Sequence, residues 1–97
     1  MAAAADVATA YNAKIAAAVQ AAFQVPMAAS ALAFKGRVRV EFVLHDGRAG
    51  TARVVLGSGL GAVDEAALRA VRSAAYPPPP ATLASQDGSY QIWVACY

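Results

Sequence analysis

The chain has 97 residues, of which 59% are hydrophobic and 14% are charged. That length suits one small domain and excludes a multidomain enzyme. Eight Lys and Arg residues against six Asp and Glu give a formal net charge of +2, which is too small for the basic surface of a nucleic-acid-binding protein, so we expect no nucleic-acid partner.

The first predicted element is a helix that ends before Pro26, because proline cannot continue a helix. Its bulky residues recur in steps of three and four, which is typical of a helix that buries one face. Asp6 suits the positive end of the helix dipole near the start. The residues of the buried face are Val7, Tyr11, Ile15, Val19, Ala22 and Phe23.

Residues 15–34 carry no charge, and their length is that of a membrane-spanning helix. We nevertheless do not expect a span, since the stretch contains Gln20, Gln24 and a central Pro26 and is nearly half alanine. After Pro26 we expect a linker without regular structure up to about Ala33.

The N-terminal residues from Met1 to Asp6 contain neither a positively charged segment nor a leucine-rich one, so no secretory signal is visible. We therefore expect either a cytosolic protein or a chain that begins downstream of such a signal. A single cysteine, Cys96, cannot close an intramolecular disulfide, so cysteine content does not decide the compartment.

Two strands joined by a tight turn are predicted next. Arg37 to His45 alternates strictly between apolar and other residues, with Val38, Val40, Phe42 and Leu44 on the buried side. Asp46-Gly47 supplies the turn, and Thr51 to Leu56 resumes a β-branched run, with Gly50 as the expected site of a bulge. These features together predict an antiparallel hairpin.

A second helix is predicted from Val63 to Ala75, with its buried face formed by Ala67, Leu68, Val71 and Ala75. Four prolines, Pro77 to Pro80, then predict a polyproline II segment. The final run, Tyr90 to Tyr97, is rich in aromatic and β-branched residues and predicts a terminal strand.

The predicted order is therefore helix, strand, strand, helix, strand. A right-handed crossover carries the third strand past the second to pair with the first, which gives an antiparallel sheet of order 2-1-3. We predict an α+β two-layer sandwich with both helices on one face of this sheet. Residues 1–97 form a single domain in this interpretation, with an N-terminal helix in 1–24 and a core in 25–97.

Catalytic and ligand-binding motifs are weak in this sequence. His45 and Ser58 lack the residue order of a catalytic triad, and one His, one Cys and six scattered carboxylates show no metal-ligand spacing. Gly57, Gly59 and Gly61 precede a helix but lack the lysine of a phosphate loop. Lys35, Arg37 and Arg39 are expected on a solvated sheet face, because Glu41 interrupts them and base-stacking aromatics are missing. We expect neither a metal nor a cofactor.

The terminal strand differs from the other elements because it is an edge strand without charge. Its alternation places Ile92, Val94 and Cys96 on one side and Trp93 and Tyr97 on the other. Edge strands usually carry protective lysine or proline, and an unprotected edge is suited to pairing with an added strand. The alternative to an added strand, which we weigh about equally, is that the first helix, the tail or a second copy of the domain covers this edge.

Five segments follow Pro26 along the chain: Gly36–Phe42, Asp46–Arg48, Val54–Gly59, Val63–Val71 and Tyr76–Pro80. In this order and at this spacing they resemble the C-terminal domain of TonB, with TolA as a more distant structural relative. The resemblance covers roughly residues 25–97. It departs from the family at Val25, where an aromatic residue usually precedes the proline, and in a hairpin that is about one residue shorter.

The resemblance implies a non-enzymatic, periplasmic domain of a protein anchored in the inner membrane, with the anchor outside these 97 residues. Such domains bind the TonB box, an extended segment of an outer-membrane transporter, by strand addition, and pass on energy from the proton gradient through an inner-membrane motor complex. The backbone positions implied for partner binding are Ser89, Tyr90, Gln91, Ile92, Trp93, Val94 and Ala95.

Three alternatives remain open from the sequence. One is a TolA-like domain for envelope tethering or phage docking, which shares the helix-first layout. Another is a small hydrolase that uses Ser58 and His45. A homodimer through the terminal strand is a third arrangement, because an exposed edge can pair with its own copy.

Overall fold

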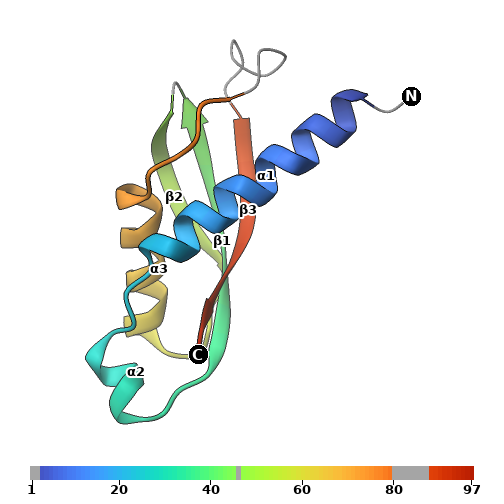
Figure 1. Cartoon of the computed structure of the whole chain (residues 1–97). Helices are drawn as coiled ribbons and strands as arrows, with labels where there is room; N and C mark the ends of the chain where they lie inside the picture. The colour runs from blue at the N-terminus through green and yellow to red at the C-terminus, as the bar shows by residue number, and fades with distance from the viewer. Residues whose placement is uncertain (1–2, 46, 80–87) are drawn as a thin grey trace.

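A computed structural model describes residues 3–45, 47–79 and 88–97, with the side chains of residues 3–8 outside that description. Within these ranges the elements are α1 (Ala3–Ala22), α2 (Met27–Ala31), β1 (Gly36–His45), β2 (Arg48–Leu56), α3 (Gly61–Ser73) and β3 (Gly88–Cys96). The three strands form one antiparallel sheet of order β2-β1-β3, and α1 and α3 cover the same face of it (Figure 1). The predicted α+β sandwich and its strand order are confirmed.

The core lies between this sheet face and the two long helices. Its buried residues come from one side of β1, from β3 and from the inner faces of α1 and α3, as the alternation of the strands and the helical spacing predict. They are Tyr11, Ile15, Val19, Val38, Val40, Phe42, Leu44, Ala67, Ala70, Val71, Ile92 and Val94. Of the other residues predicted on the buried face of the first helix, Ala22 and Phe23 pack against this cluster, although α1 ends at Ala22 and Phe23 lies just beyond it. The side chain of Val7 lies outside the described part.

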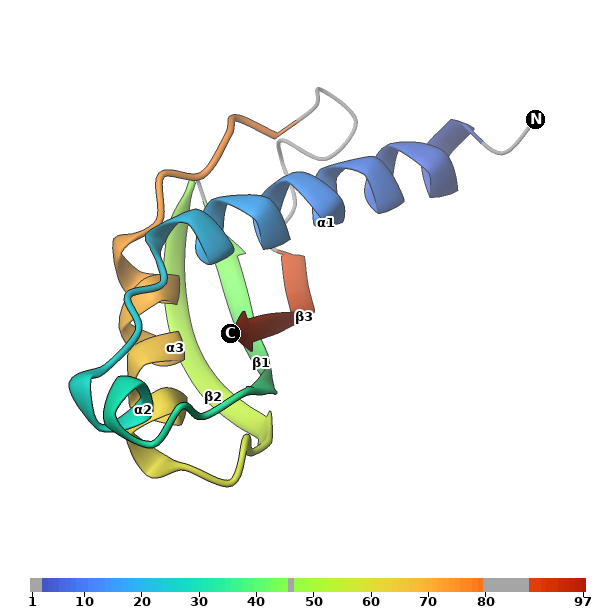
Figure 2. The ribbon, with the colours of Figure 1, turned by 60° about the horizontal axis from the view of Figure 1, so that its bottom comes forward.

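A second, smaller cluster closes one end of the molecule. Ala29 of α2, Val63 of α3 and Cys96 of β3 are buried together, with Phe23 and Phe34 packed against them. Figure 2 shows α2 beside the start of α3 at this end of the sheet. The prediction of a linker without regular structure up to about Ala33 was therefore wrong in part, because this stretch contains the short helix α2. The amides of Ala29 and Ser30 both donate to the carbonyl of Pro26 at its start.

The hairpin between β1 and β2 contains the expected irregularity. Phe42 pairs with Ala52 but Leu44 pairs with Ala49, so β2 has one extra residue in the stretch that contains Gly50. A second shift lies between Arg39 and Val40. Gly47 has φ +77°, which suits the tight turn, and Asp46 lies outside the described residues.

Several predicted boundaries were wrong by two or three residues. β2 begins at Arg48, because pairing with β1 extends it beyond the β-branched run that begins at Thr51. The second helix ends at Ser73, and the extended backbone of Ala74 leaves Ala75 exposed and outside the helix. Leu68 packs against the core, but Val63, Ala66 and Ala70 are buried more completely.

Two further features bear on the sequence expectations. Residues 77–79 form neither helix nor strand, and Pro80 lies outside the described part. Tyr11 on α1 donates its hydroxyl to the carbonyl of Pro77 at 2.8 Å, which ties this segment to the first helix. Among the described residues, no helix combines the length and the apolar character that crossing a membrane requires.

Candidate functional site

The described sheet has two edge strands, β2 and β3, and only β3 lacks a charged side chain, since β2 carries Arg48 and Arg53. We call the outer side of β3 the open edge. The one strand partner of β3 within residues 3–45, 47–79 and 88–97 is β1, which pairs along its whole length from Gly36↔Cys96 to Leu44↔Gly88 without a register shift. Unbroken alternation is therefore expected along β3, with the N–H and C=O of every second residue directed away from β1.

Gln20 identifies which residues those are. The amide of Ala95 donates to Oε1 of Gln20 at 2.8 Å, and Nε2 of Gln20 donates to the carbonyl of Ala95 at 2.9 Å. Both backbone groups of Ala95 thus face away from β1. By alternation, the same holds for the backbone groups of Ser89, Gln91 and Trp93, whereas those of Tyr90, Ile92 and Val94 face β1.

The predicted site residues divide accordingly into two sets. Ile92 and Val94 are buried in the core, and Tyr90 is half-buried, with its ring in edge contact with the ring of Tyr11 on α1. Ser89, Gln91 and Trp93 are exposed. A partner strand could therefore reach the backbone of alternate residues of β3 and their exposed side chains.

Trp93 lies on the open face of the sheet beneath two arginines. The Cζ atoms of Arg37 and Arg39 lie 4.1 and 5.2 Å from the centre of its ring, and 37% of Trp93 remains exposed. These are cation–π distances. Of the three basic residues expected on the solvated face, Lys35, Arg37 and Arg39, the two arginines thus contact an aromatic residue of β3.

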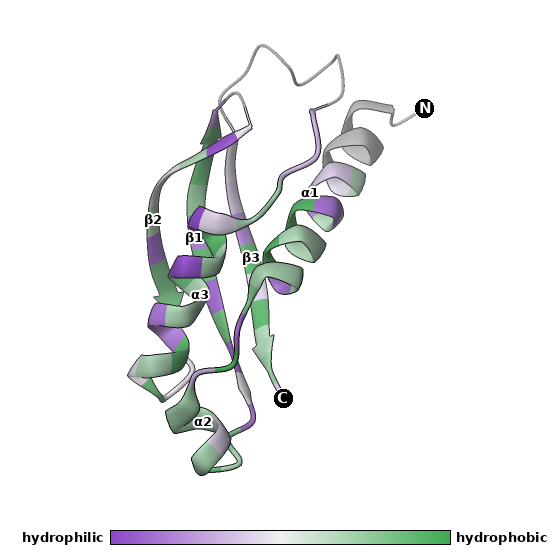
Figure 3. Cartoon of the chain, turned by 60° about the vertical axis from the view of Figure 1, so that its left-hand side comes forward, coloured by the Kyte–Doolittle hydropathy of each residue, from purple (hydrophilic) through white to green (hydrophobic). Residues whose placement is uncertain are grey.

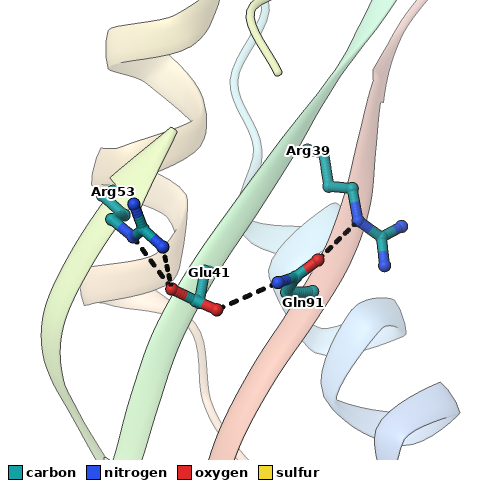
Figure 4. Close-up of polar contacts among 4 residues, drawn as sticks. All are labelled: Arg39, Glu41, Arg53 and Gln91. Carbon is teal, nitrogen blue, oxygen red and sulfur yellow. Dashed lines mark hydrogen bonds and ion pairs between the residues drawn. The ribbon is translucent and has the colours of Figure 1, made fainter. Parts of the chain in front are cut away.

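Polar contacts beside Trp93 cross all three strands (Figure 4). Arg39 donates to Oε1 of Gln91 at 2.9 Å, and Gln91 donates to Oε2 of Glu41 at 2.9 Å. Arg53 of β2 donates to Oε1 of the same carboxylate at 2.8 Å. The hydrogen bond from Gln91, followed by that from Arg53, lowers the pKa of Glu41 below its ordinary value. The side chain of Gln91 therefore has a fixed position next to the edge.

The positions of Ser58 and His45 contradict the hydrolase alternative. His45 ends β1 and Ser58 follows β2, so they lie at opposite ends of the nine-residue strand β2, which is about 30 Å long at roughly 3.3 Å per residue. The Ser58 hydroxyl donates to Oδ1 of Asp64 at 2.7 Å and accepts from the amide of Leu60 at 3.2 Å. Ser58 thus orders the turn that leads into α3.

Gly59 of this turn has a structural explanation as well. It has φ +98°, a conformation that favours glycine. The carboxylate of Asp64 accepts a hydrogen bond from the amide of Ser58 at 2.9 Å, so this turn already pairs its N–H with an acidic side chain, which would repel a phosphate. Among the described residues, no three His, Cys, Asp or Glu side chains are grouped as metal ligands.

Sequence reasoning missed Gln20, although it makes two hydrogen bonds to the edge strand. A glutamine on a helix carries no pattern that predicts a contact with a residue 75 positions away. The strand order predicts that β1 and β3 are neighbours, but the contact of Arg37 and Arg39 with Trp93 also needs the register, in which Arg39 stands opposite Trp93.

Fold and site together define a small α+β domain whose described sheet has an uncharged edge strand, β3. The chain belongs to the family described as Gram-negative bacterial TonB protein C-terminal, whose sequence model matches residues 10–95. In that family the domain is periplasmic, non-enzymatic and associated with transport.

Two solved structures of the TonB C-terminal domain of Helicobacter pylori, both determined by NMR in solution, are similar to this chain. One has a TM-score of 0.71 and 27% sequence identity, over 90% of this chain and 92% of the other. The second has a TM-score of 0.70 and 28% identity, over 86% of this chain and 76% of the other. The comparison with curated proteins gives no match.

Proposed function

We propose that this chain binds the TonB box of outer-membrane transporters by strand addition to β3 and transmits energy derived from the proton gradient for active uptake. In this proposal an anchor outside the 97 residues connects the domain to an inner-membrane motor complex. The observation that carries it is that β3 is an edge strand without a charged side chain, whereas β2, the other edge strand of the described sheet, carries Arg48 and Arg53.

The chemistry of the edge supports a peptide ligand. Residues 88–97 contain no charged side chain, so no lysine or glutamate opposes the approach of another backbone. Ser89, Gln91 and Trp93 each supply an outward N–H and C=O, and main-chain hydrogen bonds of this kind supply affinity in strand addition. Trp93 and its arginines line the adjoining open face.

Titration of the isotopically labelled chain with a synthetic TonB-box peptide tests this proposal. We expect the amide signals of residues 89–95 to shift first. Gln91→Pro should weaken binding at least several-fold, because it removes an N–H that faces outward and leaves the donors toward β1 intact. Gln91→Ala is the matched control, since it removes the same side chain but keeps the amide.

Shifts confined to other surfaces, or equal affinities for Gln91→Pro and Gln91→Ala, would contradict strand addition at β3. Indifference to every TonB-box peptide, with binding to Tol-system or phage-coat proteins, would favour the TolA-like alternative instead. A second copy of the chain is a further candidate partner for this edge. If the edge pairs with itself, the wild type should have the mass of a dimer in solution and Trp93→Lys that of a monomer, whereas a free edge gives the same mass for both.

A further inference from the structure

We propose that the side chain of Gln20 closes the last position of the open edge and so fixes where a strand added to β3 must end. This inference rests on the proposed function and deepens it, because it names the part of β3 that remains available to the partner. It assigns a positioning role to a residue of the first helix.

The two hydrogen bonds of Gln20 reproduce those of a neighbouring strand. A primary amide has one carbonyl and one N–H₂ group, and here they bond to the N–H and the C=O of the same residue, Ala95, at 2.8 and 2.9 Å. A partner strand in an antiparallel ladder makes the same pair of bonds. The outward backbone groups of Ala95 are thus already satisfied within one chain.

The helix holds Gln20 in this position. Ile15 and Val19 of α1 are fully buried between the sheet and α3, and Tyr11 is buried near β3. Figure 1 shows α1 crossing β3. Since α1 is fixed by its core residues, Gln20 needs only to order its own side chain to reach Ala95, and a strand that advanced to this position would have to displace it.

Three residues of β3 therefore remain open to a partner: Ser89, Gln91 and Trp93. Their outward groups define a paired stretch opposite residues 89–93, which ends at Trp93 beneath Arg37 and Arg39. Beyond that point the partner segment has to leave the sheet. The end of the open edge is thus defined by a side chain 75 positions away from it in the sequence.

Amide hydrogen exchange in the free chain tests the first step. In the wild type the Ala95 amide should exchange roughly tenfold more slowly than the amides of Gln91 and Trp93, as expected for an amide with an added hydrogen bond. Gln20→Ala should accelerate Ala95 by about the same factor. Gln24→Ala, which changes an exposed glutamine just after α1, should leave Ala95 unchanged. Equal rates at Ala95 in the wild type and in Gln20→Ala would overturn the inference.

Titration with a synthetic TonB-box peptide tests the second step. In the wild type, the peptide should slow exchange at Gln91 and Trp93 while the signal of the Gln20 side-chain amide stays in place. In Gln20→Ala, the peptide should protect Ala95 as well. A peptide that shifts the Gln20 side-chain amide to its solvent-exposed position would overturn the inference. A peptide that slows neither Gln91 nor Trp93 contradicts the proposed function, and the free-chain rates alone then decide the role of Gln20.

Discussion

Ala33 has a backbone conformation that its side chain disfavours. It follows α2 with φ +51°, the single non-glycine residue with positive φ among the described residues. Its amide bonds to the carbonyl of Ser30, and the next amide, Phe34, bonds to the carbonyl of Ala29, which closes the helix end. The left-handed conformation costs an alanine roughly 1–2 kcal/mol.

Replacing Ala33 with glycine should therefore stabilise the chain. We expect Ala33→Gly to raise the free energy of unfolding by about 0.5–1 kcal/mol, after allowance for the greater freedom of glycine in the unfolded chain. Ala31→Gly, an exposed change within α2, should instead lower it by a similar amount. Urea denaturation of the three chains measures the difference, and a less stable Ala33→Gly would contradict this explanation of the turn.

At the site, the burial of single residues could be predicted from the sequence, but one contact between residues could not. The alternation of β3 fixes which side chains are buried, so the exposure of Trp93 and the burial of Ile92 and Val94 could be predicted. The contact of Gln20 with Ala95 could not, because it depends on the angle at which α1 crosses the sheet. Periodicity gives the face of a helix, but it does not give that angle.

At the scale of elements, the end of α3 is held by an aromatic residue that follows it. Tyr76 donates a hydrogen bond from its hydroxyl to the carbonyl of Val71 in the last turn of α3. The centre of its ring lies 5.9 Å from the centre of the Phe42 ring. Burial raises the pKa of Tyr76 from 10.0 to about 12. The neutral phenol is the form that can donate this bond.

This pKa predicts how stability changes at alkaline pH. Since the folded pKa lies above the unfolded value, the contribution of Tyr76 is fully present below pH 10 and is lost as the pH rises through about 12. Denaturation midpoints measured across that window should fall more steeply for the wild type than for Tyr76→Phe. Parallel pH profiles for the two chains would show that Tyr76 titrates with no difference between the folded and unfolded states.

Elements were predictable where the sequence has a period and were missed where it has none. The alternation of residues 37–45 predicts β1 nearly to its ends. α2 is five residues long, shorter than two helical turns, so it offers no repeat to detect. Figure 3 shows α2 mostly in hydrophobic colours, although Met27 is 87% exposed, which explains why composition alone could not reveal its one buried residue, Ala29.

Viewed as a whole, the molecule depends on α1 for one side of its core. Ile15 and Val19 have no exposed surface and lie in the same cluster as residues of all three remaining core elements. The chain order places this helix first, and the sequence matches the family model from residue 10 onward. The first helix is thus an integral layer of the fold.

Truncation of a buried residue in α1 should therefore destabilise the whole domain. We expect Ile15→Ala to cost about 2–5 kcal/mol, which is a large part of the roughly 5–15 kcal/mol that stabilises a typical small protein. Lys14→Ala, an exposed neighbour, should change stability by less than about 0.5 kcal/mol. Denaturation followed by circular dichroism should show a single transition, and equal midpoints for the two variants would contradict an integral α1.

The buried thiol at the end of β3 has an experimental use that follows from its position. Cys96 is 1% exposed, packed with Ala29 and Val63, and its Sγ lies 4.0 Å from the carbonyl of Phe34. An alkylating reagent can reach this thiol only after the small cluster separates, so the modification rate reports how often that end opens. Because the chain has one cysteine, every label marks this position. Mass spectrometry of the wild-type chain during alkylation can thus follow fraying of the terminal strand, with and without a bound peptide.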